Sequence, residues 1–216
     1  MLVRVFVLLL AASVLGGCSM VTSDQPLFTE ADQKGAPVLR PGLWALPNSD
    51  CKYDEKSSAK GWPRCANATV VTADRLAGGE RGPSGETKGS LAYRLAAGDP
   101  PSLQIAAPED EPDGPKFIYA GLRATDFDKQ GRATAARVWL ALCSKPPKFE
   151  DAKLPDLSPK TPQNLPKGLE PRAGGVCTAK TAEAAKAAVK RSEGWLVSGG
   201  AEDFYLSAHW VRDGDD

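Results

Sequence analysis

The stretch SLAYRLAAGDPPSLQIA, residues 90–106, decides the fold class. Leu91, Tyr93 and Leu95 alternate with smaller or charged residues, which is the period-two pattern of a strand with one buried face. The break AAGDPPS that follows supplies a glycine, an aspartate and two prolines, which together indicate a turn. A second apolar segment, Leu103–Ala106, comes directly after it. The stretch therefore predicts two short strands divided by a turn.

Similar segments of strand character recur along the chain, each bounded by turn residues. They are Leu43–Leu46, Ala68–Ala73, Ser90–Leu95, Leu103–Ala106, Phe117–Ala124 and Ala133–Leu142. The last of them contains RVWLALC, which is apolar on both faces toward its end and indicates a central strand. Near the C-terminus, DFYLSAHWV alternates again and predicts a final strand, with one face formed by Phe204, Leu206, Ala208 and Trp210.

One helix is expected between these last two strands. Thr178 is a suitable N-cap for an alanine-rich segment that continues to about Glu193, where Gly194 supplies a stop. Its apolar stripe consists of small residues, which would let the helix lie close on a sheet: Ala182, Ala185 and Val189. The expected fold is therefore α+β, an antiparallel β-sheet of about six to seven short strands with one C-terminal helix packed on it.

The N-terminus has the pattern of an export signal. Arg4 precedes the apolar run Val5–Leu15, which is too short to span a bilayer but suits the centre of a signal peptide. The residues LGGC at 15–18 resemble the lipobox of bacterial lipoproteins. That resemblance implies cleavage before Cys18 and lipid on its thiol and new amine. An ordinary secretory signal with a chance cysteine is the alternative.

These features divide the chain into three parts. Residues 1–17 are the expected signal peptide, and residues 18–39 are the lipidated N-terminus followed by a flexible tether. Residues 40–216 form a single folded domain. Ser19 follows the lipidated cysteine where an Asp would favour the inner membrane, so the resemblance implies an anchor in the outer membrane of a Gram-negative envelope. Either face of that membrane is compatible with the sequence.

The cysteine count agrees with an oxidising compartment. Of five cysteines, lipid would occupy Cys18, which leaves four for two disulfides. Three pairings are open, and we favour Cys51–Cys65 with Cys143–Cys177 because each closes a local excursion. A structural metal site made of the same four thiolates is the alternative, but the CxxC spacing typical of such sites is missing.

The longer of the two loops has an unusual composition. Ser144–Arg172 contains seven prolines and many lysines but few large apolar residues, so it predicts an exposed, extended excursion. The whole chain carries 27 basic and 27 acidic residues. That balance gives no basic excess for binding nucleic acid.

Two acidic stretches are candidate cation sites. Asp126, Asp128, Gln130 and Gly131 resemble the first half of a calcium loop, but Arg137 stands where a bidentate Glu is required. A β-hairpin with its turn at residues 128–131 is the better interpretation. The run PEDEPDG, with acidic residues Glu109, Asp110, Glu111 and Asp113, has the composition of a solvated loop. We expect neither a metal site nor a cofactor.

The only histidine is the remaining candidate for catalysis. His209 lies two residues after Ser207, but the chain has no GxSxG motif. Strand alternation places His209 on the polar face, opposite Trp210, which is typical of a surface histidine. We therefore expect no catalytic residues.

A second resemblance concerns ligand binding. Gly42-x-Trp44 and Thr125-Asp126-Phe127 resemble the GxW and TDY motifs of lipocalins. That family consists of eight-stranded barrels that hold small apolar ligands, and some bacterial members are outer-membrane lipoproteins. The resemblance covers six residues.

The sequence as a whole favours a non-catalytic, membrane-anchored envelope lipoprotein. We expect a structural or binding role, with the membrane as one partner through the lipid and an envelope protein as another. A lipocalin-like barrel that carries a small apolar ligand is the alternative, and an enzyme is a third reading.

Overall fold

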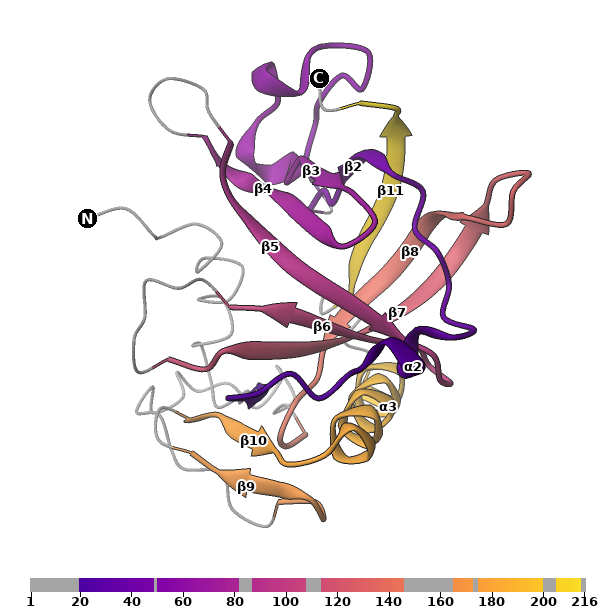
Figure 1. The fold of residues 1–216 in the computed structure, drawn as a ribbon. Helices are drawn as coiled ribbons and strands as arrows, with labels where there is room; N and C mark the ends of the chain where they lie inside the picture. The colour runs from indigo at the N-terminus through magenta and orange to yellow at the C-terminus, as the bar shows by residue number, and fades with distance from the viewer. Residues whose placement is uncertain are drawn as a thin grey trace.

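The computed structural model describes residues 20–48, 50–81, 87–107, 114–145, 165–172, 175–199 and 205–214. Eight of its strands form a closed antiparallel barrel (Figure 1). These strands are β2 (Gly42–Ala45), β3 (Thr69–Val71), β4 (Arg75–Arg81), β5 (Thr87–Ala96), β6 (Ser102–Ala106), β7 (Phe117–Phe127), β8 (Ala133–Leu140) and β11 (Leu206–Arg212). Each strand pairs with the next in this order, and β11 pairs with β2 to close the ring.

The fold class expected from the sequence is wrong, because the sheet closes on itself. The expected strands are present as β2, β3, β5, β6, β7, β8 and β11, with ends shifted by a few residues. The barrel strand that the sequence did not predict is β4, whose sequence RLAGGER has two glycines and little apolar character. Gly78 is needed there, since a Cβ atom at this position would lie 2.6 Å from the carbonyl oxygen of Ala68, the residue directly before β3. Closure leaves the barrel without a free strand edge.

Three further strands extend the sheet outside the barrel. They are β1 (Val21–Ser23), β9 (Leu169–Pro171) and β10 (Cys177–Ala179). The first runs antiparallel to the start of β7 and parallel to β10, which in turn pairs with β9. Figure 1 shows β9 and β10 beside the barrel, next to the helix α3 (Ala182–Gly199).

The helix begins and ends later than its sequence predicts. Thr178 belongs to β10, and the hydroxyl of Thr181 accepts instead from the backbone N–H of Ala184. The helix also continues through Gly194, which is exposed. The helix packs on the outside of the barrel, where the indole of Trp139 donates to the carbonyl of Val189 at 3.1 Å. Small residues on the helix therefore leave room for one large strand residue.

A glycine on the neighbouring strand completes this contact. Gly121 lies opposite Trp139 in the register of β7 and β8. A Cβ atom at Gly121 would lie 2.2 Å from the Trp139 ring, so only glycine fits there.

The flexible tether expected over residues 18–39 is wrong for residues 20–39. Val21 and Phe28 are almost fully buried against the outside of the barrel. The side-chain oxygen of Gln104 accepts from the backbone N–H groups of Leu27 and Phe28, at 2.7 and 3.0 Å. The short helix α2 (Glu30–Gln33) follows. The few apolar residues of this polar segment thus find an outer face of the barrel to cover, which local composition does not reveal.

Both predicted disulfides are present. Cys51 is bonded to Cys65, and Cys143 to Cys177. The first closes a loop that contains the short 3-10 turns η2 (Ala59–Gly61) and η3 (Arg64–Ala66). Within this loop, Trp62 is 8% exposed and packs with Leu43 and Ala45.

Some expectations lie outside the described residues. The signal peptide, Cys18, Ser19 and the acidic run at 109–113 are among them, and so is most of the excursion, residues 146–164. Within the described part of the chain, the helices are too short or too polar to cross a bilayer.

Candidate functional site

The inward face of the barrel is lined by apolar side chains, and we call this set the lining. Its members share one face through the strand register: Trp44, Thr69, Val71, Leu76, Leu91, Tyr93, Leu95, Leu103, Ile105, Ile118, Ala120, Leu122, Ala124, Ala136, Val138, Leu140, Leu206, Ala208 and Trp210. None of these positions carries a charged side chain. Each of the eight barrel strands contributes at least one large apolar residue, and β7, β8 and β11 add alanines, so the lining is hydrocarbon almost throughout.

One end of the barrel, which we call the base, is closed. Three short turns lie there, at residues 72–74, 97–101 and 128–132. The chain before β2 crosses this end, where the N–H of Arg40 donates to the carbonyl of Ala133 at 2.9 Å and the N–H of Ala133 donates to Val38 at 2.7 Å. Leu39 lies between these bonds and packs against the lining. The base is therefore covered by the chain's own backbone.

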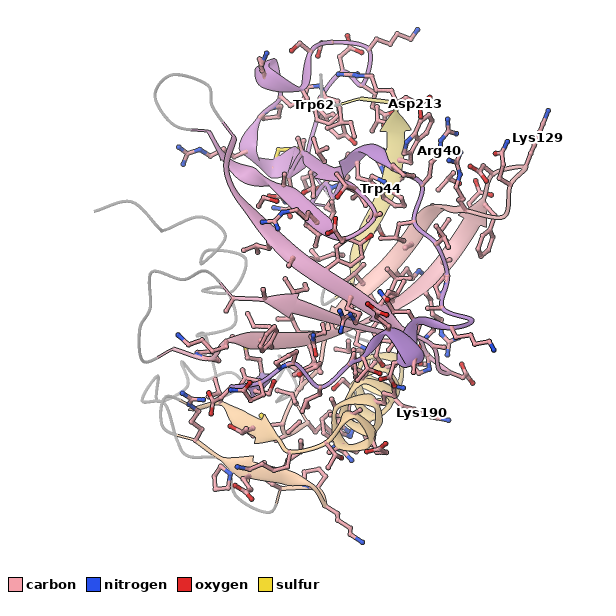
Figure 2. All side chains as sticks on the ribbon, viewed as in Figure 1. Arg40, Trp44, Trp62, Lys129, Lys190 and Asp213 are labelled. Atoms are coloured by element: carbon pink, nitrogen blue, oxygen red, sulfur yellow. A yellow bond between two sulfur atoms is a disulfide. The ribbon has the colours of Figure 1, made fainter. Side chains whose placement is uncertain are left out.

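Two indoles and one guanidinium hold the segment before β2 in place across the base. Trp44 Nε1 donates to the carbonyl of Arg40 at 2.8 Å, and Trp210 Nε1 donates to the carbonyl of Pro41 at 3.1 Å. The Arg40 guanidinium lies 3.4 Å above the Trp210 ring, and its Nη2 is 3.3 Å from the carboxylate of Asp213. Figure 2 shows Arg40 next to Asp213, with Trp44 inside the barrel beside them. Both indole donors are thus satisfied although the rings belong to the lining.

Tyr93 is the polar member of the lining nearest the base. Its hydroxyl donates to the carbonyl of Thr72 at 2.9 Å. Burial, together with the nearby Asp74 carboxylate, raises the pKa of Tyr93 to about 12. The phenol is therefore neutral at any physiological pH.

The opposite end, which we call the mouth, differs from the base. There the strands end at Ala106, Phe117, Leu140 and Leu206, which join longer connections. Ile105, Leu140 and Leu206 face inward yet are only half-buried, whereas Leu103 and Leu122 deeper inside are at most 5% exposed. The mouth therefore leaves apolar lining within reach of solvent.

The histidine lies on the outer face, as predicted. His209 Nε2 is 2.9 Å from Glu55 Oε1 and 3.2 Å from the hydroxyl of Tyr53, both on the Cys51–Cys65 loop. Burial and the Glu55 carboxylate raise the pKa of Tyr53. Ser207 is exposed and forms no hydrogen bond with His209. The arrangement fastens the loop to β11 and does not form a nucleophile–base pair.

The calcium-like stretch is a hairpin turn. The Asp128 carboxylate accepts from the backbone N–H groups of Gln130 and Arg132, both at 2.9 Å, and pairs with the Arg132 side chain. Gly131 has φ +74°, which suits the turn. These bonds lower the pKa of Asp128, although its burial acts in the other direction. Among the described residues, no three His, Cys, Asp or Glu side chains gather as a metal site would need.

Comparisons with protein families, with curated proteins and with solved structures found no match for this chain. The barrel is compatible with the lipocalin resemblance, since Gly42 and Trp44 lie on the first barrel strand and residues 125–127 lie beside a turn at the base. Sequence reasoning missed Arg40 as a partner of Trp210. The only signal for it was the placement of Trp210 on the inward face.

Proposed function

We propose that this protein is a non-catalytic, lipid-anchored binding protein of the bacterial envelope that holds a small apolar ligand inside its barrel. The observation that supports it is the contrast within the lining. An uncharged lining is covered at the base and half-exposed at the mouth, as at Leu140 and Leu206. Apolar side chains that face inward and remain accessible to solvent gain free energy when an apolar ligand covers them.

The anchor and location belong to the same proposal. The lipobox resemblance at Cys18 supports cleavage and acylation there, and Ser19 supports sorting to the outer membrane. Both disulfides agree with an oxidising compartment. Mass spectrometry of the mature protein should find lipid on Cys18 and no residues before it, and a Cys18→Ala variant should remain uncut. A soluble product cleaved elsewhere would exclude the anchor.

Ligand binding can be tested with an uncharged fluorescent probe. N-phenyl-1-naphthylamine gains emission in apolar surroundings, and it can be titrated into the soluble chain that begins at Ser19, expressed in the periplasm so that the disulfides form. Leu206→Glu introduces a carboxylate at the mouth. It should weaken binding roughly tenfold or more, because a carboxylate facing an apolar ligand is poorly hydrated.

The matched control is the next residue on the same strand. Ser207 is exposed and faces outward, so Ser207→Glu adds the same charge without entering the barrel. It should leave probe affinity unchanged. Loss of affinity in both variants, or no binding by the unmodified chain, would exclude the barrel as a carrier of such ligands.

A further inference from the structure

The first described residue is already fixed to the fold. Met20 forms a β-bridge with Leu142, and its carbonyl accepts from the backbone N–H of Cys177 at 3.2 Å. The next residue, Val21, is fully buried, and its N–H donates to the carbonyl of Ala141 at 2.8 Å. From Met20 onward the chain is therefore part of the sheet.

This placement leaves little chain between the fold and the expected lipid. Cys18 is two residues before Met20. Two residues of fully extended chain span at most about 7 Å. A flexible tether of about twenty residues would have reached roughly 25 Å. If Cys18 carries the anchor, the part of the barrel around Met20 lies at the surface of the bilayer.

The part of the barrel around Met20 is the mouth. Leu142, the bridge partner of Met20, is two residues beyond the end of β8 at the mouth. At its other end, β1 pairs Ser23 with Phe117, the first residue of β7, also at the mouth. In Figure 1, the short indigo strand β1 lies on the same side as the arrowhead of β6 and the start of β7. Both ends of β1 thus mark the end of the barrel where the lining is half-exposed.

Two exposed lysines lie near the ends of β1. Lys116 is exposed, and its backbone N–H donates to the carbonyl of Ser23 at 3.1 Å. Lys145 is exposed two residues after Cys143, near the other end of β1. Lys129, which is also exposed, lies at the tip of the β7–β8 hairpin, at the base (Figure 2).

We propose that the anchor holds the mouth against the bilayer, so that apolar ligand passes directly between the membrane and the lining. This inference rests on the proposed binding function and adds to it the source of the ligand, which is a lipid surface and not bulk solution. The ordered N-terminal segment, from Met20 to the base, would act as a rigid strap that sets the orientation of the barrel.

Orientation can be measured independently of ligand binding. The full lipidated protein is placed in vesicles of phosphatidylethanolamine and phosphatidylglycerol that contain a headgroup nitroxide quencher. A fluorophore is attached through an unnatural amino acid, so that no thiol disturbs the disulfides, at Lys145 in one sample and at Lys129 in the other. Strong quenching at position 145 and weak quenching at position 129 is expected. Equal quenching, or the reverse order, would overturn the orientation.

A second experiment tests direct transfer. A Gly/Ser insert of about twenty residues between Ser19 and Met20 lets the barrel tumble within roughly 25 Å of the surface. Transfer of N-phenyl-1-naphthylamine from vesicle to barrel should slow roughly fivefold or more, because the mouth is no longer held at the bilayer. Unchanged transfer, with normal probe affinity of the soluble chain, would overturn this inference and leave the binding function intact. Failure of the soluble chain to bind the probe would exclude the binding function itself.

Discussion

The two ends of the barrel differ in how they treat apolar side chains. At the base, the rings of Trp44 and Trp210 are held by hydrogen bonds to backbone carbonyls and by the stacked Arg40 guanidinium. At the mouth, Leu140 and Leu206 also face inward but remain half-buried. The base therefore contributes stability, whereas the mouth keeps apolar surface available. Substitutions at the base should therefore affect unfolding, and those at the mouth should affect binding.

The largest loss of stability is expected when a large apolar residue at the base is truncated, and a truncation at the mouth provides the comparison. Trp44 is 2% exposed, so Trp44→Ala should lower the free energy of unfolding by about 3–5 kcal/mol, since it removes a buried ring and leaves a cavity. Leu140→Ala should lower it by about 1–2 kcal/mol, because Leu140 is half-buried. Urea unfolding with intact disulfides measures both. Equal losses at the two positions would contradict the division between the ends.

The next effect concerns the backbone at the base. Gly42 has φ +128°, and a Cβ atom there would lie 2.4 Å from the carbonyl oxygen of Arg212. Gly42→Ala should therefore cost about 2–4 kcal/mol, because both the strain and the clash involve backbone atoms. Gly131→Ala is the control, since Gly131 has φ +74° but no neighbour within 4 Å. It should cost about 1 kcal/mol. A thermal or urea denaturation series on the two variants would reveal whether the closed base tolerates a methyl group.

Sequence reasoning found most strands but not the barrel, and the reason is physical. The alternation in Ser90–Leu95 and in the last strand is local, and it correctly placed Leu206 and Trp210 on one face. The pairing of Trp210 with Trp44 joins the last barrel strand, β11, to the first, β2, and no local pattern predicts it. The glycine-rich β4 lacks the apolar alternation that identified the other strands.

Sequence patterns also failed to predict that the N-terminal segment packs on the outside of the barrel. Val21 and Phe28 are isolated apolar residues in a polar segment, and only the shape of the completed barrel shows what they cover. The disulfide pairing could be predicted from the sequence, because each bond joins neighbouring cysteines along the chain and so closes a local loop. Among site residues, the sequence placed His209 correctly on the outside but could not bring it next to Glu55.

A smaller effect should separate stacking from ion pairing at the base. Arg40→Met removes the guanidinium above Trp210 and should lower the free energy of unfolding by about 1–2 kcal/mol. Asp213→Asn removes only the exposed ionic partner and should cost less than about 0.5 kcal/mol, because the Asp213 side chain is 79% exposed. The same unfolding assay, repeated at high salt, distinguishes the two. If the Asp213 variant lost as much stability as the Arg40 variant, the ion pair, and not the stacking on Trp210, would be the main stabilising contribution of Arg40.

The smallest effect depends on pH and concerns the segment that leads to the base. Lys186 Nζ lies 2.7 Å from the Asp32 carboxylate. That bond, together with the Thr29 N–H, lowers the pKa of Asp32 to about 2. A lowered pKa in the folded state stabilises the fold above the unfolded pKa, and the contribution is lost as the pH falls toward 2. The Asp32 and Lys186 side chains are 21% and 31% exposed, so solvent still screens the pair, and Asp32→Asn should cost less than about 1 kcal/mol at pH 6.

The pH profile gives this prediction its control. The stability difference between the unmodified protein and Asp32→Asn should shrink from pH 4 downward and vanish near the folded pKa of about 2. A difference that stays constant over this range would show that the substitution acts through packing and not through the Lys186 ion pair.

The central claim, that the lining receives an apolar ligand through the mouth, is tested most directly by methyl NMR. The soluble chain, labelled at Ile, Leu and Val methyl groups, is titrated with N-phenyl-1-naphthylamine. The methyl resonances of Ile105, Val138 and Leu140, which face inward near the mouth, should shift with a single saturable affinity, while those of Val70 and Val211 on the outer face should not. Shifts confined to the outer face, or no shifts at saturating probe, would contradict the account.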